Sequence, residues 1–239
     1  MITIAHLYYD LMNLYGENGN IKALKKALES LGCNVVVKLL SLDDTLHFED
    51  YDFVYMGTGT EANQRIVLEH LKPYQEQIKE AWNNGTYFLM TGNALELFGK
   101  QIIYSENDQV EGINLFPFVT KIENFRIVDE AFMKCKFLKD PVLGFQNHSG
   151  IQDNISSPLF EVIKGTGYKP NCQIEGIHVK NFFGTYLIGP ILIRNPKLLK
   201  YFCGKLLKQK NISVEKKLNL TLEEHAYKEF IKNYYSDIN

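Results

Sequence analysis

One stretch of the chain, residues 85–99, has the pattern of a corner that carries a nucleophile in α/β enzymes. A short apolar run over residues 87–90 stops at a turn centred on Gly92 and passes into a helical pattern that ends at Phe98. This order predicts a strand, a sharp turn and a helix, a geometry that exposes one side chain beside unpaired backbone amides. The residue at the tip is Gly92, which has no side chain. The sequence therefore predicts a corner shaped for chemistry but without its reagent.

Other residues that could replace a missing nucleophile have unsuitable positions. His148 and Ser149 are neighbours, so in an extended segment they point to opposite faces and cannot pair as base and nucleophile. Cys172 and His178 lack a third or fourth ligand at a spacing that would bind a metal. The cysteines show no C-x-x-C spacing and are predicted to be reduced thiols, mostly buried, in a cytoplasmic protein: Cys33, Cys135, Cys172 and Cys203.

The composition is that of an ordinary globular protein of 239 residues, long enough for one α/β domain with a sizeable core. The formal net charge of −2 gives no reason to expect nucleic acid or an anionic membrane as a partner. Apolar runs such as Phe182–Leu192 are too short to span a bilayer, so no membrane insertion is expected. The first residues lack the pattern of a signal peptide, which favours a cytoplasmic location.

In the first half of the chain, strand patterns alternate with helical patterns. This alternation predicts a flavodoxin-like, doubly wound and mainly parallel sheet that binds ligands at the carboxyl ends of its strands. The loop Gly57–Thr60 and the turn at Gly92 both lie at such ends. The predicted strands are Ile2–Tyr9, Cys33–Leu40, Asp52–Met56 and Tyr87–Met90, and the predicted helices are Asn20–Leu31 and Asn63–Trp82, the second broken at Pro73 with Ile66, Leu68, Leu71, Ile78 and Ala81 buried.

After Phe98 the pattern changes to short β-rich insertions, followed by two helices. Residues 1–208 are predicted to form one domain, and residues 209–239 a helical extension packed on it. A capping box of Thr221 and Glu224 is expected to start the last helix. The predicted strands are Gln101–Tyr104, Val119–Glu123, Phe125–Asp129, Val142–Asn147, Leu159–Lys164 and Asn181–Leu187, and the helices are Pro196–Leu207 and Thr221–Tyr234.

Six segments in one order resemble the class I glutamine amidotransferases of the CobB/CobQ type, and within them the glutaminase subunit of lipid II isoglutaminyl synthase. The elbow C-G-x-Y-Q-x-L-G of that subgroup aligns without gaps with Gly92–Gly99. Several short motifs in a shared order are specific, whereas each alone is weak. The other matching segments are Leu11–Ile21, Gly57–Gln64, Gly144–Gly150, Glu175–Asn181 and Gly184–Leu192.

The resemblance implies both a chemistry and its loss. In the family a cysteine attacks the side-chain amide of glutamine and a histidine transfers the proton; the aligned residues here are Gly92 and Ile188. The resemblance implies no metal or cofactor, and an ATP-dependent, Mur-ligase-like subunit as the partner. It assigns substrate binding to Gly57, Gly59, Asn93, Asn147 and His148.

Three functions remain open from the sequence. The first is a catalytically silent glutaminase-like subunit that holds or regulates its ligase partner in cell-wall precursor modification. The second is a module that binds glutamine or another small molecule in a remodelled pocket, with Asp10 and Asn13 lining a cleft beside Gly92 and with helix-start amides left free. The third is an active amidotransferase with an unrecognised nucleophile. The downstream substrate, lipid II or a cobyrinate-like precursor, is also open.

Overall fold

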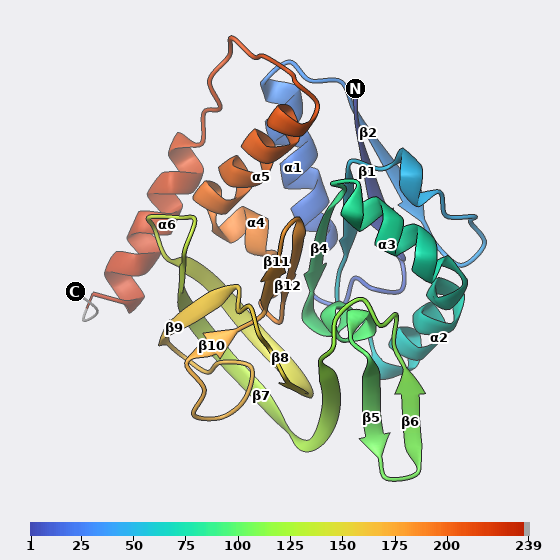
Figure 1. Cartoon of the computed structure of the whole chain (residues 1–239). Coiled ribbons are helices and arrows are strands. Elements are labelled where there is room, and N and C mark those ends of the chain that lie inside the picture. Colours follow the sequence, from blue (N-terminus) through green and yellow to red (C-terminus); the bar gives the residue numbers. More distant parts are fainter. Residues whose placement is uncertain (237–239) are drawn as a thin grey trace.

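The first sheet is built mainly from the first half of the chain in this computed structural model, which describes residues 1–236 (Figure 1). Its strand order is β11-β12-β4-β3-β1-β2, and all neighbours are parallel except β11 and β12. Without β11, this is the order of a flavodoxin-like sheet, so the predicted fold class is confirmed. The strands are β1 (Ile2–Leu7), β2 (Val35–Leu40), β3 (Phe53–Met56), β4 (Tyr87–Thr91), β11 (Ile177–Val179) and β12 (Phe182–Thr185).

Helices cover both faces of this sheet. Neighbouring residues of β1 face opposite cores: Ile4 packs in the cluster with Leu24 and Phe202, whereas Ala5 packs in the cluster with Leu68. Burial on both faces explains why the central strands β3 and β4 are nearly continuous apolar runs rather than alternating ones. The helices are α1 (Asn18–Ser30), α2 (Glu61–Leu71), α3 (Gln75–Asn83), α4 (Ile191–Arg194), α5 (Pro196–Gln209) and α6 (Thr221–Tyr234).

The predicted break at Pro73 is present, because a 3₁₀ turn over Lys72–Tyr74 separates α2 from α3. Four of the predicted core positions are buried: Leu68, Leu71, Ile78 and Ala81. The prediction for Ile66 is wrong, since its side chain is 49% exposed. Residues 64, 67, 68 and 71 form the buried stripe of α2, and Ile66 lies outside that helical face.

A second, β-rich sheet is added below the first (Figure 1), and it runs in the order β10-β9-β7-β5-β6 with β8 also paired to β7. The two strands predicted between residues 119 and 129 are one long strand, which has an irregularity between Ile122 and Ile127. Strand β6 was not predicted because its sequence, Asp-Gln-Val-Glu, is mostly polar. The strands are β5 (Gln101–Ser105), β6 (Asp108–Glu111), β7 (Val119–Cys135), β8 (Val142–Asp153), β9 (Phe160–Lys164) and β10 (Ile174–Glu175).

Helix α6 has the predicted bounds but not the predicted capping box. The Thr221 hydroxyl donates to Asn219 Oδ1, and the Glu224 carboxylate lies 2.7 Å from Lys197 Nζ instead of capping the helix. The tertiary ion pair therefore takes the side chain that local pattern assigned to the helix start. Of the described residues, no helix is long and apolar enough to cross a bilayer.

Candidate functional site

Three chain segments meet at the carboxyl edge of the first sheet. Met56 at the end of β3 pairs with Met90 of β4, and Thr91 of β4 pairs with Thr185 of β12. The segments that follow these strands are therefore neighbours, as expected at the ligand-binding edge of a doubly wound sheet. They are the loop over residues 57–60, the turn at Gly92, and the segment over residues 186–189.

The turn after β4 has the backbone of a nucleophile corner. Gly92 has φ +61° and begins a 3₁₀ turn that runs to Phe98. This left-handed conformation is readily adopted by glycine. A Cβ at Gly92 would lie 2.5 Å from Thr58 Oγ1 and 3.3 Å from Ile188 Cγ2. The space that a side chain at the tip would need is occupied.

Hydrogen bonds of Thr58 and Asn93 connect the loop over residues 57–60 to the turn at Gly92. The Thr58 hydroxyl donates to Asn93 Oδ1 at 2.9 Å, and the backbone N–H of Asn93 donates to Thr58 Oγ1 at 3.3 Å. Asn93 Oδ1 also accepts from the backbone N–H of Gly59, and its amide donates to the Gly59 carbonyl. The expectation of a free amide is therefore wrong for Asn93, because the Thr58 side chain accepts its hydrogen bond and also fills the space beside Gly92.

A buried carboxylate, Glu17, lies behind the corner and was not singled out from the sequence. Its Oε2 accepts hydrogen bonds of 2.5 Å from the hydroxyls of Tyr55 and Thr91, and its Oε1 accepts from the backbone N–H of Gly189 at 3.3 Å. Burial raises the pKa of Glu17, and the hydrogen bonds oppose that rise. Glu17 thus links β3, the residue before Gly92 and the residue after Ile188. Its place in the matched segment Leu11–Ile21 was the available signal.

A cleft of about 360 Å³ opens beside the corner. Four of the five predicted substrate-binding residues line it, namely Gly59, Asn93, Asn147 and His148. The fifth, Gly57, packs against Glu17 and the Met12 carbonyl. Gly92 and Ile188 do not line the cleft, and neither do Asp10 and Asn13, so the expectation for the latter two is wrong. The cleft is lined by Leu14, Tyr15, Thr58, Gly59, Thr60, Glu61, Asn93, Glu96, Ile122, Arg126, Asn147, His148, Ser149 and Gly150.

Arg126 supplies a cation to this cleft from the irregular part of β7. Its guanidinium donates to Asn147 Oδ1 at 2.9 Å, to Ser149 Oγ at 3.0 Å and to the Asn147 carbonyl at 3.2 Å. Asn147 in turn donates to the Tyr15 hydroxyl at 2.6 Å. Sequence reasoning missed Arg126, because a single arginine in a predicted strand carries no motif. Its position makes the cleft suitable for a carboxylate, which a guanidinium binds well.

Two buried titratable groups form the inner wall of the cleft. Burial raises the pKa of Glu96 to about 7, against hydrogen bonds from Gln64 at 2.7 Å and from the Tyr186 hydroxyl at 3.0 Å. His148 stacks on Tyr186 with ring centroids 3.7 Å apart, and burial lowers its pKa to about 4. Neutral His148 donates from Nδ1 to the Gly150 carbonyl at 2.8 Å, leaving Nε2 buried and without a partner among the described residues.

The cleft offers hydroxyls but no thiol among the residues that the structure describes. Cys33, Cys135 and Cys203 are buried elsewhere, and Cys172 is partly exposed outside the cleft. The Ser149 hydroxyl accepts from Arg126, and Thr60 caps α2 by accepting from the Asn63 N–H at 3.1 Å. Within residues 1–236, no three His, Cys, Asp or Glu side chains are grouped in a way that could hold a metal ion.

Comparison with known proteins places this architecture among the glutamine amidotransferases. One crystal structure of a glutamine amidotransferase has a TM-score of 0.56 at 12% identity, covering 85% of this chain and 98% of that one. The glutaminase domain of Trypanosoma brucei CTPS with bound acivicin has a TM-score of 0.51 at 8% identity, covering 93% of this chain and 99% of that one. At these identities the likeness concerns the fold.

The family follows from the sequence matches. The chain belongs to the CobB/CobQ-like glutamine amidotransferase domain family, whose profile matches residues 3–196. It is 32% identical over 241 residues to the lipid II isoglutaminyl synthase (glutamine-hydrolyzing) subunit GatD of Streptococcus pneumoniae, with 99% of this chain and 91% of that protein covered. It is 29% identical over 216 residues to the GatD subunit of Staphylococcus aureus, with 90% and 88% covered.

Proposed function

We propose that this chain is a GatD-like subunit that does not hydrolyse glutamine. The observation that carries the proposal is the filled corner, where Thr58 lies against Gly92 and no side chain projects from the tip of the turn. The position aligned with the family base holds Ile188, whose side chain is 1% exposed. Attack on a side-chain amide requires an activated nucleophile, and an isoleucine cannot act as a base.

In this proposal the chain serves its ligase partner as a binding scaffold and does not supply ammonia from glutamine. A silent subunit would bind an ATP-dependent, Mur-ligase-like partner that amidates a cell-wall precursor, and would hold or regulate that partner while the partner uses free ammonia. The complete sheet and the hydrogen-bonded elbow support this function, because docking to a partner requires a folded scaffold but not the catalytic side chains.

The test is ammonia release from glutamine by the native chain, alone and with its ligase partner. We expect no release above the background, since loss of the principal catalytic residues of a hydrolase costs about 10⁶ in rate. A native rate in the usual enzyme range of about 1–10³ s⁻¹ would disprove the proposal.

A reconstruction experiment provides the positive control. The Thr58→Gly/Gly92→Cys/Ile188→His variant clears the corner and introduces a thiol and a base, so we expect it to gain measurable glutaminase activity. The Gly92→Cys/Ile188→His variant, which keeps Thr58, is the matched control and is expected to be much less active. Its cysteine would meet the threonine side chain.

A second candidate function is binding of a small carboxylate ligand in the cleft. The observation that favours it is the guanidinium of Arg126, held by Asn147 and Ser149 at the surface of an intact cleft. Glu61 on the same lining gives an anion for a ligand amine, so amino acids, glutamine included, match the charges. Thermal-shift measurements with amino acids and dicarboxylates test this function, and the absence of any shift would contradict it.

A further inference from the structure

A second concave surface lies between α1, the start of α5 and the segment before α6, and it shares no lining residue with the cleft. We call it the basic groove; its volume is about 510 Å³. Helix α1 gives one wall, and the start of α5 with the segment before α6 gives the other. It is lined by Gly19, Lys22, Ala23, Lys26, Ala27, Ser30, Leu192, Ile193, Pro196, Leu199, Leu218, Asn219, Leu220, Thr221, Leu222 and Glu223.

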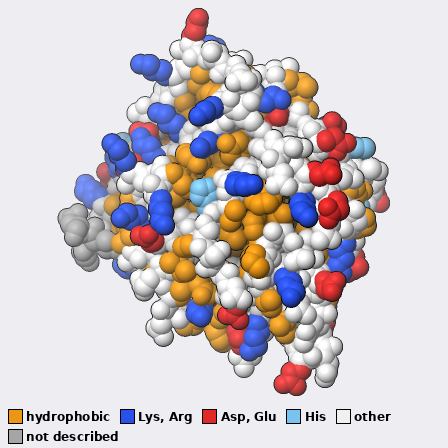
Figure 2. Space-filling model, viewed as in Figure 1, with side chains coloured by type: hydrophobic (Ala, Val, Ile, Leu, Met, Phe, Trp, Pro, Cys, Tyr) orange, Lys and Arg blue, Asp and Glu red, His pale blue; other side chains and the backbone are white. Residues whose placement is uncertain are grey.

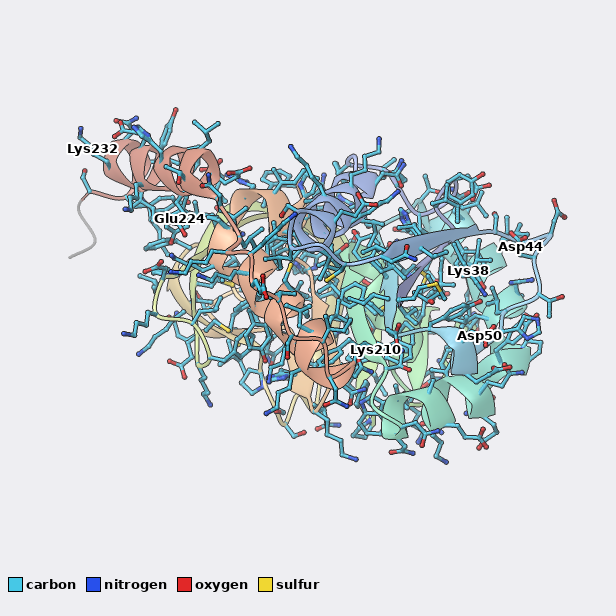
Figure 3. All side chains as sticks on the ribbon, turned by 90° about the horizontal axis from the view of Figure 1, so that it is seen from above. Lys38, Asp44, Asp50, Lys210, Glu224 and Lys232 are labelled. Carbon is cyan, nitrogen blue, oxygen red and sulfur yellow. The ribbon has the colours of Figure 1, made fainter. Side chains whose placement is uncertain are left out.

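Apolar side chains at the groove remain open to solvent. Leu222 is 82% exposed and Ile193 is 49% exposed, and both line the groove. Helix α6, which begins at the groove, has no buried residue along its described length. Figure 3 shows this helix, with Glu224 and Lys232 labelled, at one end of the molecule. Exposed apolar side chains gathered at a concave site are typical of a surface that binds a protein partner.

The charged side chains that line the groove are Lys22, Lys26 and Glu223. The segment around one wall of the groove is basic, since residues 191–220 contain eight Lys or Arg residues and one acidic residue, Glu215, although the whole chain has a formal net charge of −2. None of these eight basic residues lines the groove itself. Figure 2 shows Lys and Arg side chains gathered on the side of α5 and α6, and Asp and Glu more numerous on the side of α2 and α3. On the α1 rim, Lys22 and Lys26 are exposed and form no ion pair with any described residue, whereas Lys25 pairs with Glu29.

We infer that the basic groove docks an acidic, amphipathic segment of the partner subunit. Apolar side chains of that segment would enter between α1 and residues 218–222, and its carboxylates would pair with Lys22 and Lys26. The small floor residues Ala23 and Ala27 would let a helix approach closely, as in other complexes where a groove binds the apolar face of a helix. This inference rests on the proposed function in one respect, because the proposed function identifies the partner as the ATP-dependent ligase subunit.

Two other occupants fit the surface less well. A second copy of this chain related by two-fold symmetry would bring the same basic face against itself, so Lys22 and Lys26 would repel their equivalents. A bilayer of anionic lipid would match the charge, but a flat surface would leave the concave floor unfilled. An acidic protein segment satisfies both the charge and the shape.

The test measures the affinity of the full chain for the purified ligase subunit by calorimetry. We expect Lys22→Glu/Lys26→Glu and Leu222→Glu each to weaken binding by about tenfold or more, because central apolar anchors and close charge pairs dominate interfaces of this kind. The matched controls are Lys79→Glu on α3 and Leu39→Glu on β2, which replace exposed side chains of the same types outside the groove. We expect both controls to bind like the native chain, and native binding to weaken with added salt.

The outcomes separate the docking assignment from the proposed function. If the native chain binds the ligase subunit and the groove variants bind equally well, the docking assignment is wrong and the partnership stands. If the native chain does not bind the ligase subunit, the partnership itself is wrong and the assignment falls with it. If light scattering shows a dimer that only the groove variants lose, the groove instead binds a second copy of the chain. If the native chain floats with vesicles of phosphatidylglycerol and only the groove variants do not, the groove instead binds lipid.

Discussion

The side chain of Thr58 fills the space beside the α-carbon of Gly92, since a Cβ at position 92 would lie 2.5 Å from Thr58 Oγ1. The side-chain sizes that fit at positions 58 and 92 therefore depend on each other. A larger residue at 92 needs a smaller one at 58, and Thr58 needs glycine as its neighbour. This pairing converts a corner that could present a nucleophile into a packed, hydrogen-bonded part of the sheet edge.

Gly92→Cys alone is expected to destabilise the fold. Overpacking against Thr58 and the left-handed backbone at φ +61° together should lower the free energy of unfolding by about 2–4 kcal/mol. Adding Thr58→Gly should recover the overpacking part, so the double variant should be more stable than Gly92→Cys. Urea denaturation of the two variants and of Thr58→Gly measures this coupling. Additive effects of the two substitutions would contradict the contact.

Glu96→Gln is expected to remove a loss of stability that the native chain undergoes as pH rises towards neutral. Burial raises the pKa of Glu96 to about 7, so the folded state holds its proton more tightly than the unfolded state. This contribution is present at low pH and is lost as pH rises from about 4.5 to about 7, by about 3 kcal/mol at most. The variant lacks it, so its advantage should grow over that range and level off above it.

Denaturation at several pH values between 4.5 and 8 measures the Glu96 effect. The matched control is Glu80→Gln, since Glu80 is an exposed carboxylate on α3. A stability difference between Glu96→Gln and the native chain that does not change with pH would show that the carboxyl group is not responsible.

His148→Phe is expected to reduce the loss of stability that the native chain undergoes as pH falls, whereas the Glu96 effect appears as pH rises. Burial lowers the pKa of His148 to about 4, so the unfolded state binds a proton more readily, and stability is lost as pH falls from about 6.5 to about 4. Phenylalanine keeps a ring to stack on Tyr186 but cannot be protonated. The variant should therefore retain more of its stability near pH 4.5 than the native chain does.

Thermal unfolding from pH 7 to pH 4.5 tests the His148 prediction. His6→Phe is the comparison, because burial also lowers the pKa of His6 to about 4 at a position away from the cleft lining. Equal losses in the native chain and in His148→Phe would mean that His148 does not control the acid response.

Arg126→Ala is expected to abolish any thermal shift caused by carboxylate ligands while leaving the fold intact. The guanidinium is exposed, and its loss removes the cation that the cleft offers to a carboxylate. Arg65→Ala is the control, because Arg65 pairs with Asp108 away from the cleft. An unchanged shift in Arg126→Ala would place the ligand elsewhere. Differential scanning fluorimetry with the same ligands measures all three proteins.

Much of the fold could be predicted from the sequence because the signals are local. The alternation of apolar strands with amphipathic helices defined the parallel sheet, and Pro73 marked the break between α2 and α3. The long strand β7 was divided in the prediction, since polar residues around its irregularity interrupt the apolar pattern. The ordered motifs, each a short sequence signal, predicted the family to which the chain belongs.

The sequence by itself determined that position 92 is glycine, that position 188 is isoleucine, and that both lie in segments of an amidotransferase scaffold. Only the tertiary structure decided what fills the corner, which residues line the cleft and where charge gathers. Thr58, Arg126 and Glu17 come to the site from separate segments, and an α1 wall meets residues 218–223 only after folding. Periodicity reports which face of an element is buried, but contacts between distant segments depend on how the elements pack in three dimensions.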